Sequence, residues 1–251
     1  MKPTLIVTHL ADRDSGLVEE ILVELGLPVI VCHALDQASL PAIDQLAAIV
    51  SLGGSMSATE LGRHPFLAEE VGLLHAALQR RLPILGLCLG AQLLAVAGGG
   101  LVSKIGHVCL GWPQLSMLSE ARLDPVFAEL PAGLPVLKWH EDRIDAPPGA
   151  TVLASSPPGT ALFRVGPVAW GSQMHLEATP SMLLDGWLTE AHGIAEIEAA
   201  GRPIADFRAE CRARLPAQMA HARQVLTRFV GLTARRGEAA VRPAESTGGR
   251  T

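Results

Sequence analysis

The sequence contains no tyrosine, and aromatic residues make up only 4% of its 251 residues. Hydrophobic residues nevertheless account for 49% of the chain. We therefore expect an aliphatic, alanine-rich core that is large enough to fold without disulfides or metals. Basic residues form no stripe and do not alternate with aromatics, and the formal net charge is -5. This charge pattern argues against a nucleic-acid partner.

Long apolar runs are also missing from the chain. No run approaches the roughly 20 residues that cross a bilayer, and the N-terminus, MKPTLIVTHLADRD, lacks the apolar core and cleavage site of a signal peptide. The four cysteines form no C-x-x-C pair and no zinc-like spacing. We expect a protein of the reducing cytoplasm with no membrane span, no disulfide framework, no metal and no cofactor.

Strand-like and helix-like segments alternate in the first hundred residues. Short apolar runs typical of buried strands occupy 4–9, 27–33, 46–54 and 83–88, and helical spacing of apolar residues occupies 16–26, 66–81 and 91–100. This alternation predicts an α/β fold with a mostly parallel sheet and helices on both faces. Binding sites in such sheets form beyond the carboxyl ends of the strands, where GGSMS and Cys88 fall.

The pattern changes after Gly106. Short strand-like segments separated by Pro and Gly follow, and they predict antiparallel additions to the sheet. From Ser181 to about Leu232 the chain is predicted to be helical. We expect one domain over residues 1–232 and a disordered tail over 233–251, because the tail has small, polar and charged residues without an apolar period.

Cys88 lies in a G-x-C-x-G motif, in which Gly86 and Gly90 flank it at a strand-to-helix junction. This is the cysteine form of the nucleophile elbow. Its sulfur would lie at a helix N-terminus, where the partial positive charge stabilises a thiolate, and the Leu89 amide would face the reacting carbonyl. An isolated cysteine beside leucines is also typical of a buried core. The motif alone leaves both interpretations open.

A candidate base lies downstream, in VAWGSQMHLEATP. His175 and Glu177 are two residues apart, just after a strand-like run, so the carboxylate can reach back to the imidazole. His175 would then take the thiol proton of Cys88, and Glu177 would hold the imidazole in the required tautomer. An exposed strand-end pair is the alternative, since the chain has nine histidines.

Five segments occur in an order that resembles the class I glutamine amidotransferases, particularly the stand-alone, GMP-synthase-like type. They are VSLGGSMSA, HPFLAEE, PILGLCLGAQLLA, WHEDRIDAPPGATVLASSP and VAWGSQMHLEATP. The resemblance extends from the first strand to about Leu232. It implies a flavodoxin-like α/β fold, with the following roles: a catalytic triad of Cys88, His175 and Glu177, an oxyanion hole from the Gly53–Gly54 loop and Leu89, and substrate binding by Gln92.

The resemblance also implies an activity. Cys88 would attack the side-chain amide of glutamine, or a related small γ-glutamyl compound, releasing ammonia or an amine and leaving a γ-glutamyl thioester for water to hydrolyse. Only a short tail follows the helices, so use of the ammonia would require a separate synthetase chain. Two alternatives stay open: a hydrolase of γ-glutamyl peptides or amides with the same triad, and a non-catalytic binding or regulatory subunit.

Three positions depart from the family pattern. Leu176 replaces a common proline, Met174 replaces an aromatic residue, and Glu141 replaces a frequent glycine. None of them removes a triad group, so they bear on the identity of the substrate more than on the chemistry.

His140 and Asp142 either border the pocket or lie in a solvated loop.

Overall fold

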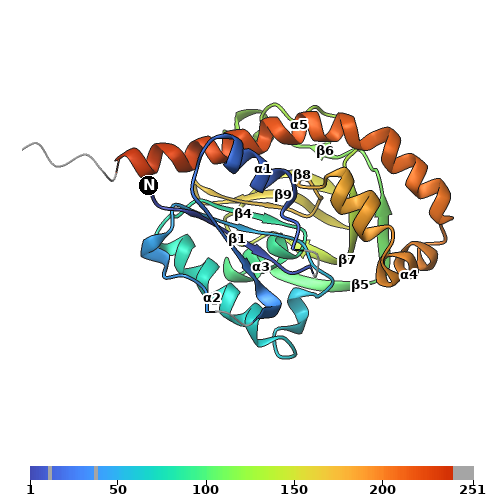
Figure 1. Ribbon diagram of the computed structural model, residues 1–251, viewed down its shortest axis with the longest axis horizontal. Coiled ribbons are helices and arrows are strands. Elements are labelled where there is room, and N and C mark those ends of the chain that lie inside the picture. Colours follow the sequence, from blue (N-terminus) through green and yellow to red (C-terminus); the bar gives the residue numbers. More distant parts are fainter. Residues whose placement is uncertain (11–12, 37–38, 240–251) are drawn as a thin grey trace, which may run out of the picture.

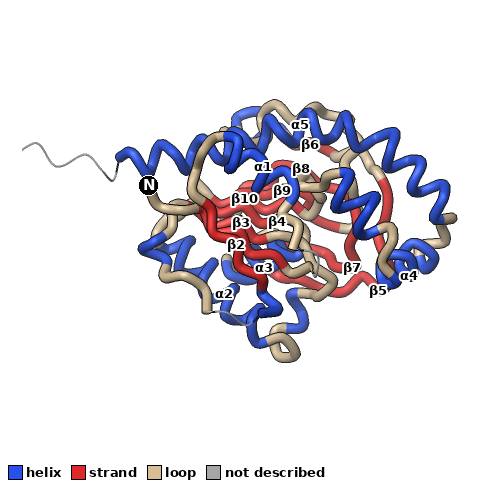
Figure 2. Tube along the Cα trace, in the orientation of Figure 1, coloured by secondary structure: helices blue, strands red, loops and turns tan. Residues whose placement is uncertain are grey.

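The computed structural model describes residues 1–10, 13–36 and 39–239, and its centre is an eight-stranded sheet in the order β2-β1-β3-β4-β10-β9-β8-β6 (Figures 1 and 2). Neighbouring strands are parallel from β2 to β10. These strands are β1 (Thr4–Thr8), β2 (Val29–His33), β3 (Ala48–Ser51), β4 (Ile84–Leu87) and β10 (Ala169–Ser172). The predicted α/β class with a mostly parallel sheet is confirmed.

Helices cover both faces of the sheet, as Figure 1 shows. Helices α1 (Gly16–Glu24) and α5 (Ile204–Ala239) lie on one face, and α2 (Pro65–Gln79) and α3 (Leu89–Ala97) lie on the other. Successive residues of β1 pack on opposite faces of the sheet. Ile6 packs in the core that includes α1 and α5, whereas Leu5 packs in the core that includes α2 and α3. Burial on both sides explains why the three central residues of the strand are all apolar.

The second half of the sheet is antiparallel. It contains β6 (Ser116–Met117), β8 (Thr151–Ser156) and β9 (Gly159–Val165). Two further strands, β5 (Leu101–Gly111) and β7 (Lys138–Asp145), form a separate antiparallel pair. The prediction that all strand-like segments after Gly106 add antiparallel to the sheet is therefore only partly right.

Strand β10 is the important exception, because it pairs parallel with β4, with Ala169 opposite Ile84 and Ser172 opposite Leu87. The carboxyl ends of the two strands consequently lie side by side. This register brings the chain after Ser172 next to Cys88, although 87 residues separate Cys88 from His175 in the sequence. Hydrophobic periodicity reveals that a segment is a strand, but not which strand it pairs with.

The described chain after Pro180 is largely helical, as predicted. A π-helix, η5 (Ser181–Trp187), is followed by α4 (Ala191–Ala199) and then by α5. Helix α5 continues to Ala239, so residues 233–239, which were expected to be disordered, continue it; Ala, Arg and Glu in this stretch are strong helix formers. Residues 240–251, the rest of the predicted tail, lie outside the described residues.

Short 3₁₀ helices connect several elements: η1 (Ala34–Asp36), η2 (Ile43–Gln45), η3 (Ala58–Glu60) and η4 (Ser119–Leu123). Over the described part of the chain, we find no helix with the length and apolar character needed to span a membrane.

Candidate active site

Cys88 forms the sharp turn between β4 and α3. Its φ of +50° is unusual for a residue with a side chain, and it marks a strained backbone held by its surroundings. The Cys88 amide donates to the Ser172 carbonyl at 2.8 Å, and the Gly90 amide donates to the Leu52 carbonyl at 3.1 Å. These bonds fix the turn to the neighbouring strands. The side chain is 4% exposed.

The two glycines of the motif are required by close backbone approach. A Cβ atom on Gly86 would collide with the backbone of Gly90, and one on Gly90 would collide with the backbone carbonyl of Ser51. Because these contacts are with backbone, no side-chain rotation can relieve them. The spacing G-x-C-x-G therefore encodes the turn through steric exclusion.

Gly90→Ala is expected to destabilise the protein by about 2–4 kcal/mol, since the new methyl overpacks backbone that cannot move freely. Gly72→Ala is the matched control, because Gly72 lies in α2 with nothing within 4 Å of its Cβ position. There alanine should stabilise the helix by about 0.5–1 kcal/mol. Urea unfolding of both variants measures the difference, and equal midpoints would contradict the steric requirement at Gly90.

The imidazole of His175 lies between Glu177 and the cysteine turn. His175 Nδ1 is 2.8 Å from Glu177 Oε1, and His175 Nε2 is 3.2 Å from the backbone carbonyl oxygen of Trp139. The Cys88 thiol donates to the same carbonyl at 3.7 Å. The structure thus brings Cys88, His175 and Glu177 together in one buried cluster, with His175 5% and Glu177 0% exposed.

The electrostatics of the cluster favour a charged imidazole. Burial by itself lowers the pKa of His175, but the negative charges of Cys88 and Glu177, together with hydrogen bonds to both, outweigh that effect. The pKa of His175 is therefore raised well above its usual value. The site therefore stabilises the imidazolium that His175 becomes when it takes a proton.

Two residues that sequence reasoning missed hold His175 in place. Gln218, fully buried in α5, donates to the His175 carbonyl at 2.8 Å and accepts from the Leu137 amide at 2.6 Å. The Trp187 ring packs against the imidazole at 4.9 Å between centroids. A buried glutamine on the apolar side of a long helix is a signal for such a role, although the partner cannot be read from the sequence.

The Gly53–Gly54 loop lies directly over the cluster. A Cβ on Gly53 would stand 3.1 Å from His175 Cε1 and 3.5 Å from Cys88 Cβ, so the loop backbone borders the sulfur closely. Within the described residues, the Leu89 amide, at the first position of α3, has no hydrogen-bond partner. Amide groups at both places are therefore available to a ligand near Cys88.

A buried contact between a histidine and a glutamate lies next to this loop. His9 Nε2 lies 2.7 Å from Glu70 Oε2, and the two side chains are 0% and 1% exposed. A Cβ on Gly54 would lie only 2.6 Å from His9 Cβ, which shows how tightly the loop rests on this pair. The contact links α2 to the position of the loop.

Gln92 lies one helical turn after Cys88 and is 2% exposed. Its Oε1 accepts from the Ala58 amide at 3.2 Å, which fixes the orientation of the side chain. Asp142, whose carboxylate accepts from Ser57 Oγ at 2.9 Å, is near enough to hydrogen-bond to Gln92. Burial raises the pKa of Asp142. The hydrogen bonds to Ser57 and Gln92 lower this pKa, but burial has the larger effect.

The cluster opens into a cavity of about 110 Å³. Cys88, His175, Gly53, Gly54 and Gln92 all line it, as do Trp139, His140, Glu141 and Asp142. His140 and Asp142 thus border the cavity and are buried, which decides between the two interpretations left open by the sequence.

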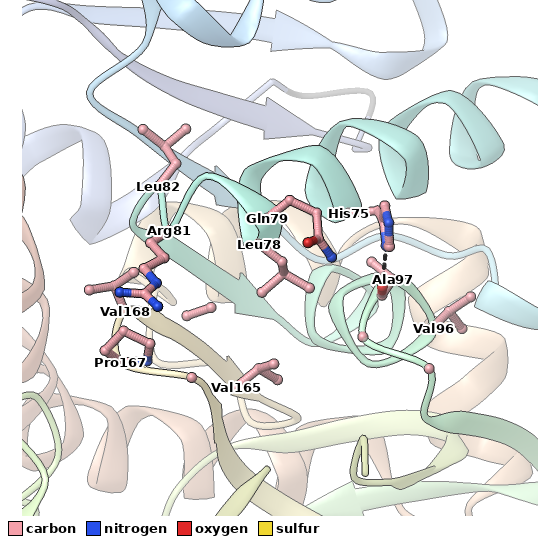
Figure 3. A pocket seen from close by; sticks show the side chains of 14 residues that line it. His75, Leu78, Gln79, Arg81, Leu82, Val96, Ala97, Val165, Pro167 and Val168 are labelled. Atoms are coloured by element: carbon pink, nitrogen blue, oxygen red, sulfur yellow. Dashed lines mark hydrogen bonds between the residues drawn. The ribbon is translucent and has the colours of Figure 1, made fainter. Parts of the chain in front are cut away.

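A larger cavity of about 560 Å³ lies at the other end of the central strands, where β4 and β10 begin (Figure 3). His75, Leu78 and Val165 line it, and His75 Nδ1 is 3.0 Å from the carbonyl oxygen of Ala97. It holds no cysteine and no carboxylate among the described residues that line it. We therefore assign the chemistry to the smaller cavity. Over the described chain, no group of three or more side chains is arranged to bind a metal.

The buried His140 side chain should make the free energy of unfolding depend on pH. Burial, assisted by the positive charge of Lys138, lowers the pKa of His140 from 6.5 to about 3. Between these values the unfolded chain binds a proton that the folded protein does not, so stability rises with pH across this window. His140→Asn should flatten the rise by about 1.4 kcal/mol per pH unit. Unfolding measured from pH 4.5 to 6.5 tests this, with exposed His107→Asn as the control; equal slopes in His140→Asn and wild type would contradict it.

Comparisons with known proteins identify relatives of the chain in sequence and in fold. The family described as "Glutamine amidotransferase class-I" matches residues 15–188. A GMP synthase [glutamine-hydrolyzing] of Leifsonia xyli is 33% identical over 195 residues, and one of Thermomicrobium roseum is 39% identical over 125 residues. The matches cover 74% and 47% of this chain but only 37% and 23% of those longer proteins.

Solved structures give the same fold. A glutamine amidotransferase from Thermotoga maritima superposes with a TM-score of 0.80 at 27% identity, covering 91% of this chain and 98% of that one. A glutamine amidotransferase from Methylobacillus flagellatus superposes with a TM-score of 0.82 at 24% identity, covering 92% and 95% respectively, which bears on the fold alone.

Proposed function

The chain belongs to the class I glutamine amidotransferase family, and on this premise we propose that it hydrolyses the γ-amide bond of glutamine or of a γ-glutamyl compound. One observation carries the proposal: Cys88, in a positive-φ turn, shares a buried cavity with a His175–Glu177 pair joined at 2.8 Å. A nucleophile, a base and a group that orients the base are the three parts that such a hydrolysis needs.

The first half-reaction forms a thioester. His175 Nε2 takes the thiol proton, and the Cys88 sulfur attacks the γ-carbonyl carbon, whose oxygen gains the electron pair. Amides of Leu89 and the Gly53–Gly54 loop stabilise that oxyanion. The C–N bond then breaks, and the imidazolium of His175 donates its proton to the departing nitrogen.

The second half-reaction regenerates the enzyme. His175, now neutral, removes a proton from water as the water attacks the γ-glutamyl thioester. The C–S bond breaks, glutamate leaves, and the sulfur recovers a proton from His175. Glu177 keeps the Nδ1 proton facing it and balances the positive charge of the imidazolium in both halves. Gln92, fixed by the Ala58 amide, holds the glutamyl part of the substrate.

Two uses of the reaction are compatible with this site. The nitrogen product passes to a separate synthetase chain, or the protein acts alone as a hydrolase of γ-glutamyl compounds. The GMP synthases that match this chain are much longer than it, and the matches cover only 37% and 23% of their length.

The thioester is the intermediate that tests the mechanism. Purified protein incubated with glutamine, or with γ-glutamyl amides, in the presence of hydroxylamine should give γ-glutamyl hydroxamate as well as glutamate, because hydroxylamine intercepts the thioester. Ammonia or amine release should match the sum of both products. Failure to release nitrogen from glutamine and from every γ-glutamyl amide would leave the non-catalytic binding role as the better interpretation.

A further inference from the structure

The cavity that contains Cys88 is lined by more carboxylates than lysine or arginine side chains. Four carboxylates line it, namely Glu141, Asp142, Glu190 and Glu196, whereas Lys104 is the single lysine or arginine among the described residues around it. Glutamine carries one positive and one negative charge, so it does not need this excess. Acidic clefts concentrate cationic ligands and repel anionic ones.

The charges are divided between two walls. On the wall formed by β5 and β7, Lys104 lies 3.9 Å from Glu141. A wall with both signs complements the ammonium and carboxylate groups of the glutamyl part, which every substrate of the proposed reaction shares.

A second wall, formed by η5 and α4, has carboxylates without lysine or arginine; His192, whose Nε2 lies 3.5 Å from Glu196 Oε1, is also part of it. Glu196 is held there by Trp139, whose Nε1 donates to its Oε2 at 2.7 Å, and Glu190 is exposed at the start of α4. The Trp187 indole lines the same wall. Carboxylates beside an aromatic ring form a favourable surface for an alkylammonium group, through ion pairing and cation–π attraction.

A second feature of the cavity points to a ligand. His140 is only 8% exposed, and neither ring nitrogen makes a hydrogen bond of normal geometry among the described residues, although the Asp142 backbone lies near enough to interact with the ring. Buried polar groups are normally paired, so an unpaired imidazole lining a cavity indicates a partner that binds there. An uncharged imidazole accepts a hydrogen bond from an ammonium group and adds no charge that would repel one.

We propose that the leaving group is an amine that carries an ammonium group at its far end. The substrates are then γ-glutamyl amides of aliphatic diamines or polyamines. This inference rests on the proposed hydrolase function. Water cleaves the bond between the γ-carbonyl carbon and the amide nitrogen, giving glutamate, which gains the hydroxyl, and the free amine, which gains the proton. The η5–α4 wall binds the distal ammonium group while Cys88 attacks.

A set of matched substrates tests the proposal with the full chain. γ-Glutamyl amides of 1,4-diaminobutane, n-butylamine and 4-aminobutanoate have leaving groups of similar length that are cationic, neutral and anionic. We expect kcat/KM to fall in that order, by about tenfold at each step. Glutamine should be a poorer substrate than the diamine amide. Raising the salt from about 0.05 to 0.5 M should reduce the differences, because the ions screen the exposed carboxylates.

A charge-neutralising variant locates the effect. Glu190→Gln should reduce the ratio of kcat/KM for the diamine amide to that for the butyl amide by about threefold. Glu198→Gln is the control, because Glu198 is an exposed residue of the same helix that does not line the cavity, and its ratio should equal that of wild type.

The outcomes separate this inference from the proposed function. Cys88-dependent hydrolysis at equal kcat/KM for all three amides, or a preference for glutamine, would overturn the diamine inference and leave the hydrolase function intact. Absence of hydrolysis of every substrate would overturn both. A ratio in Glu190→Gln equal to that in Glu198→Gln would show that the α4 wall does not bind the amine.

Discussion

Cys88→Ala is expected to reduce hydrolysis of the preferred substrate by about 10⁴-fold or more, because no other described residue that lines the cavity has a thiol to form the γ-glutamyl thioester. The change removes only a sulfur atom from a side chain that is 4% exposed, and the turn is held by backbone bonds to Ser172 and Leu52. The fold should therefore survive. Glutamate release measured at saturating substrate, beside thermal unfolding of the same preparation, tests both statements.

The other buried cysteine provides the control for this experiment. Cys211 lies in α5 and is 0% exposed, and burial raises the pKa of its thiol to about 11. A protonated thiol in the core is a poor nucleophile. Cys211→Ala should therefore keep nearly full activity. Equal product release by wild type and Cys88→Ala would overturn the assignment of Cys88 as the nucleophile.

The cysteine turn could be predicted from the sequence because its causes are local. Gly86 and Gly90 are needed at fixed spacing from Cys88, since a Cβ at either position meets backbone. The parallel strands were visible for a similar reason, because burial on both faces leaves an uninterrupted apolar run. His175 and Glu177 were recognised by their spacing just after a strand-like run, and the structure places them in the turn after β10.

The remaining features depend on contacts between distant segments. The parallel pairing of β10 with β4 places His175 beside Cys88, but the sequence of β10 would fit an antiparallel neighbour equally well. The carbonyl of Trp139, which both Cys88 and His175 approach, is a backbone group that no residue type signals. Gln218 reaches His175 from α5, 43 residues away. Such contacts are properties of the assembled fold.

The separation of β5 and β7 from the main sheet has the same origin, and it matters for the site. Their residues Lys104, Glu141 and Asp142 line the cavity as a wall beside the strand ends. A strand added to the sheet edge, as the sequence suggested, would lie far from Cys88, because four strands stand between β4 and that edge. The independent pair is what brings charged side chains to the mouth of the cavity.

Two replacements of Glu177 should distinguish its role in orienting the His175 ring from its role in balancing the charge of that ring. Glu177→Ala leaves His175 Nδ1 buried without its 2.8 Å partner, and we expect kcat to fall by about 10²- to 10⁴-fold. Glu177→Gln should lose less, because its amide oxygen still accepts from Nδ1–H. In both variants the pKa of His175 should fall, since Glu177 no longer contributes its negative charge. Steady-state kinetics and NMR titration of His175 measure these effects, and activities within about threefold of wild type would rule out Glu177 as the residue that orients the base.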